Sequence, residues 1–344
     1  MKTDTRKKNS IALGLKTDAI ETRYSFPWLF DLLAEEGVRH VQVGSFFEIY
    51  TLEDGWFENL KAEATQRGLI LKSVFTAHRE LGGFFYGDPF MERTARRGCE
   101  RLLRAAALLG ADYCGWNPGA IYRDRPDSKP AGLACFHRHL RELMRHAHSL
   151  GLKAITLEPM SCLAEPPSTP DEIRTMMETA AAYHCAHYDT TVPVYLCGDI
   201  SHGVADRDRK VVHGNLELFE FSIPWMAEFH FKNTDAIFNS TFGFNKEERA
   251  RGIVDLGEIL RRIERSADRW PVDDIVGYLE ISGPKIGRDY SDYRLGNELR
   301  ASLRAIKNAF AEYGSGSAAA SGPLLSLPSP PPALCPLPPV PYVA

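Results

Sequence analysis

Short apolar runs alternate with longer amphipathic segments along most of the chain. Several runs are apolar on both faces, as strands of a covered parallel sheet are. The segments between them place apolar residues three and four positions apart, most clearly over residues 90–110 and 134–151, which is typical of helices. Eight strand–helix alternations predict an α/β fold of the (β/α)8 TIM barrel type. The predicted strands span residues 11–15, 38–44, 69–75, 111–116, 153–158, 192–199, 225–231 and 275–281.

Helix ends are marked at several places. Thr169 is a suitable N-cap, Pro170 a suitable first helical residue, and Glu172 completes a capping box. The last helix is expected over residues 291–313, with Gly314 just after it. Residues 203–221 are charged and have a poor apolar period, so we expect a long loop with a short helix there.

The two ends of the chain differ from the region between them. Residues 1–9 form a polar extension, and residues 314–344 hold 9 of the chain's 22 prolines. Proline at that density supports neither helix nor sheet, which predicts a disordered tail. A polyproline ligand for a partner domain is the alternative. We therefore expect one folded domain over residues 10–313.

Composition and charge limit the expected partners and the expected cellular location. The chain has 344 residues, of which 44% are hydrophobic and 25% charged, with a net charge of −4. This ordinary balance does not point to a nucleic-acid or membrane partner. No run of about 18 apolar residues predicts a membrane span, and no apolar segment follows the basic first residues as in a secretory signal. Seven scattered cysteines without CxxC spacing favour reduced thiols in a cytoplasmic protein.

Four of the predicted strands end in a residue that can bind a metal. The residues are Glu158 in ITLEPM, Asp199 in VYLCGDISH, His230 in AEFHFKN and Glu280 in VGYLEIS. The C-terminal strand ends of a barrel converge on one mouth, where the chemistry occurs. Three carboxylates and one imidazole suit Mn²⁺, Mg²⁺ or Co²⁺ better than a thiolate-rich structural zinc site does. The sequence therefore predicts one divalent metal ion at the mouth.

The order LEPM, DxxH, FH and LE resembles the xylose isomerase-like barrel superfamily, within it the sugar and sugar-phosphate epimerases and isomerases of the tagatose 3-epimerase type. The resemblance covers roughly residues 10–310. It implies that the four residues bind one divalent cation and that Glu158 and Glu280 are the acid/base pair. It also implies that His202 touches the substrate. The chain departs from the family after His230, where an arginine is expected and Lys232 is the natural substitute.

The chemistry agrees with these implied roles. Epimerisation next to a ketone requires removal of a weakly acidic C–H proton, and a metal on the substrate oxygens stabilises the resulting enediolate. One carboxylate on each face of the sugar can remove and return that proton. Metal binding lowers the basicity of a carboxylate, so each glutamate must be only partly committed to the ion.

The substrate contacts are less specific. The run ISGPKIGRDYSDYR, after the eighth strand, offers Ser282, Lys285 and Arg288, and barrels often bind phosphate there. A surface turn with solvated charges is the alternative. His78, after the third strand, either lines the pocket or is structural. We expect a sugar or sugar phosphate, with a lean toward phosphate. The same segment resembles the erythrulose-1-phosphate (tetrulose-phosphate) 3-epimerases of erythritol catabolism.

Other functions stay open at this stage. An aldose–ketose isomerase or a cyclitol dehydratase would use the same metal site, and a silent sugar-binding barrel is less favoured because both glutamates are present. A zinc-dependent endonuclease of abasic DNA is remote, because the run NTDAIFNSTFGFNKEE lacks the additional histidine and the net charge is −4. His139 and His146 share a predicted helix face without another ligand type, so no second metal site is expected there. The sequence leaves a homo-oligomer open.

Overall fold

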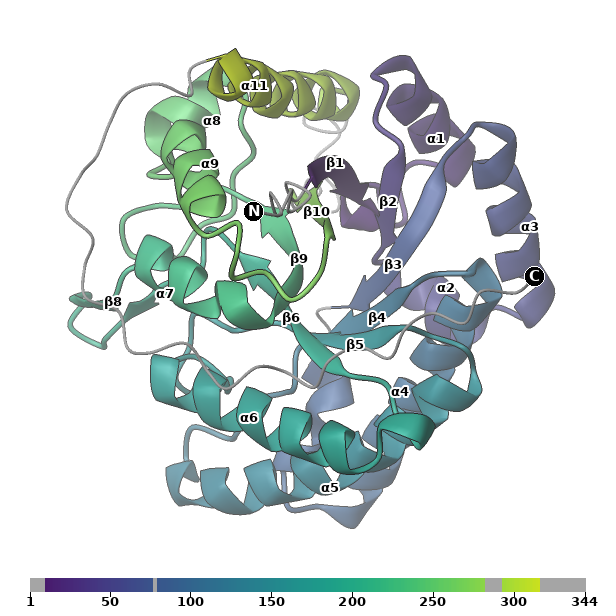
Figure 1. The fold of residues 1–344 in the computed structure, drawn as a ribbon, viewed down its shortest axis with the longest axis vertical. Helices are drawn as coiled ribbons and strands as arrows, with labels where there is room; N and C mark the ends of the chain where they lie inside the picture. The colour runs from purple at the N-terminus through teal and green to yellow at the C-terminus, as the bar shows by residue number, and fades with distance from the viewer. Residues whose placement is uncertain (1–9, 77–78, 282–292, 316–344) are drawn as a thin grey trace, which may run out of the picture.

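A computed structural model describes residues 10–76, 79–281 and 293–315, and its strands form a closed barrel inside a ring of helices (Figure 1). All neighbouring barrel strands are parallel, in the order β1-β10-β9-β6-β5-β4-β3-β2. The predicted (β/α)8 barrel is confirmed. The strands are β1 (Ser10–Lys16), β2 (His40–Val43), β3 (Ile70–Thr76), β4 (Tyr113–Trp116), β5 (Ala154–Leu157), β6 (Val194–Asp199), β9 (Met226–Phe231) and β10 (Asp274–Leu279).

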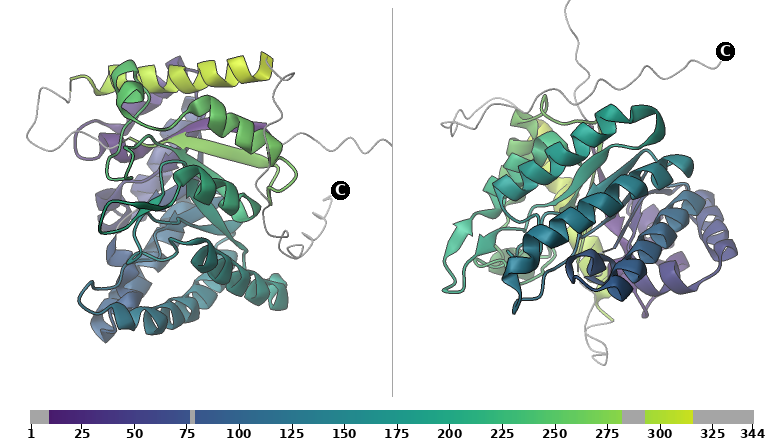
Figure 2. Two further views of the ribbon diagram at one scale, coloured as in Figure 1. Left: turned by 90° about the vertical axis from the view of Figure 1, so that its left-hand side faces the viewer. Right: turned by 90° about the horizontal axis from the view of Figure 1, so that it is seen from below.

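Helices cover the outside of the barrel, with α11 on the side opposite α5 and α6 (Figures 1 and 2). Among the described residues, no helix is long and apolar enough to cross a membrane. The α-helices are α1 (Phe26–Glu35), α2 (Phe46–Thr51), α3 (Asp54–Gln66), α4 (Pro89–Leu109), α5 (Lys129–Ser149), α6 (Pro170–Ala186), α7 (Asn215–Ser222), α8 (Lys246–Arg251), α9 (Leu256–Arg265) and α11 (Leu295–Ser315). Short 3₁₀ turns span Thr17–Ile20, Arg79–Phe85, Pro126–Ser128, Tyr188–Thr190 and Ile223–Trp225.

Two predicted helix ends need correction. The side chain of Thr169 accepts from the backbone N–H of Glu172, so the predicted N-cap of α6 is confirmed. Glu172 does not close a capping box, because its carboxylate accepts from the backbone of Ser168 at 2.9 Å, one residue before the N-cap. At the other end of the chain, α11 continues to Ser315, so Gly314 lies inside the last turn. Such ends vary by one or two residues.

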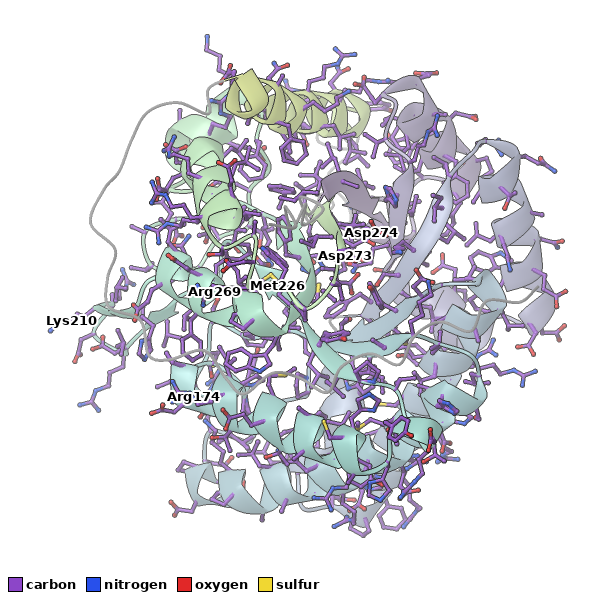
Figure 3. The ribbon with its side chains drawn as sticks, viewed as in Figure 1. Arg174, Lys210, Met226, Arg269, Asp273 and Asp274 are labelled. Carbon is purple, nitrogen blue, oxygen red and sulfur yellow. The ribbon has the colours of Figure 1, made fainter. Side chains whose placement is uncertain are left out.

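The segment after β6 is more ordered than its sequence indicates. The expected short helix is α7, but the expected loop contains a hairpin of β7 (Val204–Ala205) and β8 (Val211–His213). Lys210, in the turn between these strands, lies at the outer edge of the molecule in Figure 3. Whether two strands pair as a hairpin depends on the type of turn between them. The hydrophobic pattern of so short a segment does not reveal the turn type.

The interior of the barrel is polar below its mouth. Gln42, Ser73, Thr156 and Glu228 point inward from four strands, and all are fully buried. Ser73 and Thr156 donate hydrogen bonds to Glu228 Oε1 at 3.0 and 2.8 Å. Burial raises the pKa of Glu228. The N-terminal ends of β9 and β10, marked by Met226 and Asp274, lie near the centre of Figure 3, and the mouth is at the opposite end. This layer is therefore a polar floor under the four strand ends.

A buried carboxylate ties the last helix to the first. Glu36 follows α1 and accepts from Arg304 Nη2 at 2.7 Å and from Lys307 Nζ at 3.0 Å, both on α11. The hydrogen bond from Arg304 is the main reason why the pKa of Glu36 falls from 4.5 to about 2. A carboxylate with a depressed pKa stabilises the fold above its unfolded pKa, and that stability is lost as the pH falls toward the folded value.

We therefore expect Glu36→Gln to lower the free energy of unfolding by roughly 1–3 kcal/mol at pH 7. The difference from the natural chain should shrink as the pH falls from 4.5 to about 2, because the natural carboxylate becomes protonated. Urea unfolding at pH 7, 4 and 2.5 measures both effects. A difference that is the same at every pH would mean that charge on Glu36 is not the cause.

Candidate metal centre

The structure brings the four predicted ligands together at the C-terminal mouth of the barrel. One ligand atom from each of Glu158, Asp199, His230 and Glu280 lies within 4.8 Å of the others. Asp199 and His230 belong to β6 and β9, and the two glutamates directly follow β5 and β10. His230 is fully buried, and Glu158 and Asp199 are nearly so. The geometry is therefore that of a single small site.

Gln42, from the polar floor of the barrel, orients the imidazole of His230. Its Nε2 lies 2.8 Å from Gln42 Oε1, a contact in which the nitrogen donates. Its Nδ1 faces Glu158 Oε1 at 3.1 Å and Glu280 Oε2 at 3.4 Å. Burial lowers the pKa of His230, but these two carboxylates raise it above the ordinary value. Nδ1 thus points at a place that attracts either a proton or a metal ion, and the two compete.

The two glutamates have matching surroundings. Glu158 Oε2 accepts from Asn117 Nδ2 at 2.7 Å, while its Oε1 faces His230. Glu280 Oε1 accepts from Lys16 Nζ at 2.7 Å, while its Oε2 faces His230. Burial alone would raise the pKa of Glu158, but His230 lowers it to about 2. Burial also opposes ionisation of Glu280, and Lys16 and Lys232 hold its pKa well below the usual range.

One buried lysine, Lys16, and one partly buried lysine, Lys232, balance part of the negative charge. Lys232 Nζ lies 2.5 Å from Asp199 Oδ2 and 2.9 Å from Glu280 Oε2. Lys16 bridges Glu280 and Asp18. The three carboxylate ligands and Asp18 outnumber these two ammonium groups, and burial raises the pKa of Asp18. A divalent cation would add positive charge among these carboxylates, and the oxygen-rich donors suit a hard ion, so the residues present fit such a metal.

The predicted substrate residues are only partly described. His202 Nδ1 donates to the backbone carbonyl of Pro159 at 2.7 Å, and its Nε2 lies 3.3 Å from Asp199 Oδ2 and 3.2 Å from Lys232 Nζ. Both His202 and Lys232 are thus at the edge of the cluster, each with a side chain about one eighth exposed. Four further predicted contacts lie outside the described residues: His78, Ser282, Lys285 and Arg288.

Four site residues were not predicted in these roles: Lys16, Gln42, Asp18 and Asn117. Lys16 is the first charged residue after an apolar strand, so the rule that found the four ligands also applies to it. Gln42 is a polar residue between two valines in HVQV, which is a weaker signal. Asp18 lies two residues beyond Lys16, and nothing in the local pattern separates it from a solvated turn residue.

A second group of possible ligands lies outside the barrel. Glu92 on α4 meets Cys135 and His139 on α5, so other ligand types do accompany one of the helix histidines, contrary to expectation. Arg138 already supplies a cation there, because its Nη2 donates to Glu92 Oε1 at 2.8 Å and to Cys135 Sγ at 3.3 Å. Burial raises the pKa of the Cys135 thiol. The group is therefore an interhelical ion-pair cluster.

Gln42 gives a direct test of the metal centre. We expect Gln42→Leu to weaken Mn²⁺ binding by about 10–100-fold, because a ligating histidine depends on the partner of its second nitrogen. Titration calorimetry measures the change. Ser73→Ala is the matched control, since Ser73 contacts Gln42 Nε2 at 3.3 Å but not the imidazole. Equal affinity of the Gln42→Leu variant and the natural chain would show that Gln42 does not orient a metal ligand.

Comparison with known proteins agrees with the fold. A family model described as the xylose isomerase-like TIM barrel matches residues 30–273. A search of curated proteins finds no match. Three solved structures share the fold at low identity. A xylose isomerase candidate from Rhodospirillum rubrum is 18% identical over 87% of this chain and 99% of its own, with a TM-score of 0.70.

The other two are sugar epimerases by name. D-psicose 3-epimerase from Clostridium cellulolyticum is 15% identical over 88% of this chain and 98% of its own, with a TM-score of 0.63. A 3-keto-D-glucoside 4-epimerase from E. coli is 14% identical over 89% of this chain and 100% of its own, with a TM-score of 0.57. At these identities the likeness establishes the shared fold.

Proposed function

The chain belongs to the xylose isomerase-like TIM barrel family, and on that premise we propose that it is a metal-dependent epimerase or isomerase of a ketose or ketose phosphate. The observation that carries the proposal is the placement of Glu158 and Glu280. Each presents one oxygen to the cluster of candidate metal ligands and the other to a separate hydrogen-bond donor. Two carboxylates held in this way can serve opposite faces of one substrate.

In the proposed reaction, one glutamate accepts the proton from the carbon next to the substrate carbonyl. The electron pair of that C–H bond moves into the new carbon–carbon double bond, and the carbonyl oxygen gains negative charge. The other glutamate, as the protonated acid, gives its proton to the opposite face of this carbon: the electron pair of the double bond forms the new C–H bond, the carbonyl re-forms, and the carbon is inverted. Nothing is oxidised or reduced, and the second proton comes from solvent through the carboxyl group.

The metal has a limited part in this scheme. Asp199, His230, Glu158 and Glu280 would hold Mn²⁺, Mg²⁺ or Co²⁺, and the bound ion would stabilise the charge that develops on the substrate oxygen. Lys232 and His202 stand at the edge of the cluster, where they would hydrogen-bond the sugar. Ser282, Lys285, Arg288 and His78 are kept as predicted substrate contacts.

The most specific form of the proposal is an erythrulose-1-phosphate 3-epimerase of erythritol (tetritol) catabolism. The solved structures of the same fold include sugar 3- and 4-epimerases, whose names denote inversion near a ketone. The alternative is an aldose–ketose isomerase or a cyclitol dehydratase on the same metal site. We place the activity in a cytoplasmic catalytic domain of residues 10–313, and the oligomeric state stays open.

A deuterium-exchange screen tests the function. The protein, loaded with Mn²⁺, is incubated in D₂O with tetruloses, pentuloses, hexuloses and their phosphates, and the products are examined by NMR. Exchange at C3 is expected and indicates epimerisation, whereas exchange at C1 or C2 indicates isomerisation. The Glu158→Gln/Glu280→Gln double variant is the control for exchange that the protein does not catalyse. The absence of exchange with every ketose would refute the proposed function.

A further inference from the structure

Lys16 is a fully buried lysine that reaches the mouth of the barrel. It is the last residue of β1, and its ammonium group lies 2.7 Å from Glu280 Oε1 and also contacts Asp18. The ammonium lies 5.6 Å from the centroid of the Phe75 ring, which also makes a T-shaped contact with the imidazole of His230. A buried ammonium is costly unless it is paired, and here two carboxylates pair it.

Lys16 binds one particular oxygen of Glu280. That oxygen, Oε1, is not the one that faces the metal ligands, because Oε2 is the atom 3.4 Å from His230 Nδ1. Glu158 is held in the same way, with Asn117 Nδ2 on Oε2 and His230 beside Oε1. Both glutamates therefore have one oxygen in the cluster and one outside it, and in each case a non-ligand donor holds the outer oxygen.

The end of β2 is shaped to admit Lys16 and Asp18. A Cβ atom at Gly44 would lie 1.7 Å from Asp18 Oδ1 and 3.3 Å from Lys16 Cε. The backbone N–H of Gly44 donates to Thr17 Oγ1 at 2.9 Å, which fixes the chain between Lys16 and Asp18 against this strand. Any side chain larger than hydrogen at position 44 would displace the ion pair. The space beside Gly44 is thus filled by the Lys16–Asp18 ion pair.

We propose that Lys16 is a positioning residue that keeps Oε1 of Glu280 out of the metal ligand set, so that this glutamate can exchange a proton with the substrate. The proposal rests on the proposed epimerase function. A carboxylate that bound the ion through both oxygens would have no oxygen left for the C–H proton. Asn117 does the same for Glu158. A change at Lys16 must therefore impair one face of the substrate and spare the other.

The test uses each epimer of the accepted ketose separately in D₂O with Mn²⁺. We expect Lys16→Met to lower kcat for epimerisation by roughly 10–100-fold, a range typical of lost support for a site residue. For the epimer whose proton faces Glu280, the rate of deuterium exchange should fall by the same factor as kcat. For the other epimer, whose proton faces Glu158, the exchange rate should stay within about threefold of that of the natural chain. KM and the Mn²⁺ affinity should also stay within about threefold of the natural values. Lys16→Arg, which retains a cationic donor, should recover part of the lost rate.

Lys72→Met is the matched control, because Lys72 is a half-buried lysine on β3 that pairs with Asp112 at 2.5 Å, away from the cluster. It should leave both exchange rates unchanged. If Lys16→Met fails to fold, Lys16→Met/Asp18→Asn removes the unpaired carboxylate, and the same one-sided loss is expected. Unchanged epimerisation, or an equal loss for both epimers together with weaker Mn²⁺ binding, would overturn the proposal. No exchange by the natural chain would instead remove the epimerase function on which the proposal rests.

Discussion

Replacing either Glu158 or Glu280 by glutamine should abolish epimerisation while the barrel stays folded. A positioned general acid or base contributes about 10²–10⁴-fold, and each glutamate is needed in every inversion, so kcat should fall by at least roughly 10³-fold. Glutamine is nearly isosteric and keeps an oxygen for the Asn117 or Lys16 contact. Steady-state kinetics gives the loss, and circular dichroism with thermal melting confirms the fold.

The two variants should lose deuterium exchange with opposite epimers of the substrate. Glu158→Gln should retain deuterium exchange only for the epimer whose proton faces Glu280, and Glu280→Gln only for the other. Glu36→Gln is the matched control, since it removes a buried, cation-paired carboxylate far from the mouth and should leave kcat unchanged. Near-normal kcat in either site variant would show that the reaction does not use two carboxylates.

Removal of divalent metal should also abolish activity. Charge stabilisation by a metal is worth several kcal/mol, so the rate after EDTA treatment and desalting should drop by at least about 100-fold. Mn²⁺, Mg²⁺ or Co²⁺ should restore it. Because the ion would bind the folded site and not the unfolded chain, it should also stabilise the fold, by about 2.7 kcal/mol at a metal concentration 100 times Kd.

The thermal shift provides a readout that does not depend on the substrate. Added Mn²⁺ should raise Tm of the natural chain and have little effect on Asp199→Asn. Because the neighbouring carboxylates raise the pKa of His230, the ion must displace a proton there, and its affinity should fall as the pH falls. Full activity of a metal-free preparation, verified by elemental analysis, would remove the metal from the mechanism.

The barrel and the four candidate metal ligands at its strand ends could be predicted because both depend on local signals. Strands buried on both faces form continuous apolar runs, and a charged residue directly after such a run stands out. Parallel strands that close into a barrel bring their C-terminal ends to one mouth, so Glu158, Asp199, His230 and Glu280 had to be neighbours. The cap at Thr169 is equally local and was also predicted.

Contacts between distant segments could not be predicted in the same way. Lys16 and Glu280 are 264 residues apart, and Gln42 and His230 are 188 apart. Which oxygen of Glu280 each lysine binds depends on the directions of side chains from three different strands. Periodic patterns likewise do not predict the hairpin of β7 and β8. They also do not predict the cluster of Glu92 with Cys135 and His139.

By itself, the sequence determined the fold class, the types of the four candidate metal ligands and their meeting point, because hydrophobic periodicity and barrel geometry are sufficient for these. Only the tertiary structure decided how the charges in the mouth are balanced and how each glutamate is divided between the ligand cluster and an outer donor. The physical reason is that Coulomb and hydrogen-bond energies depend on distances of a few ångströms between side chains from different strands, which no one-dimensional pattern contains.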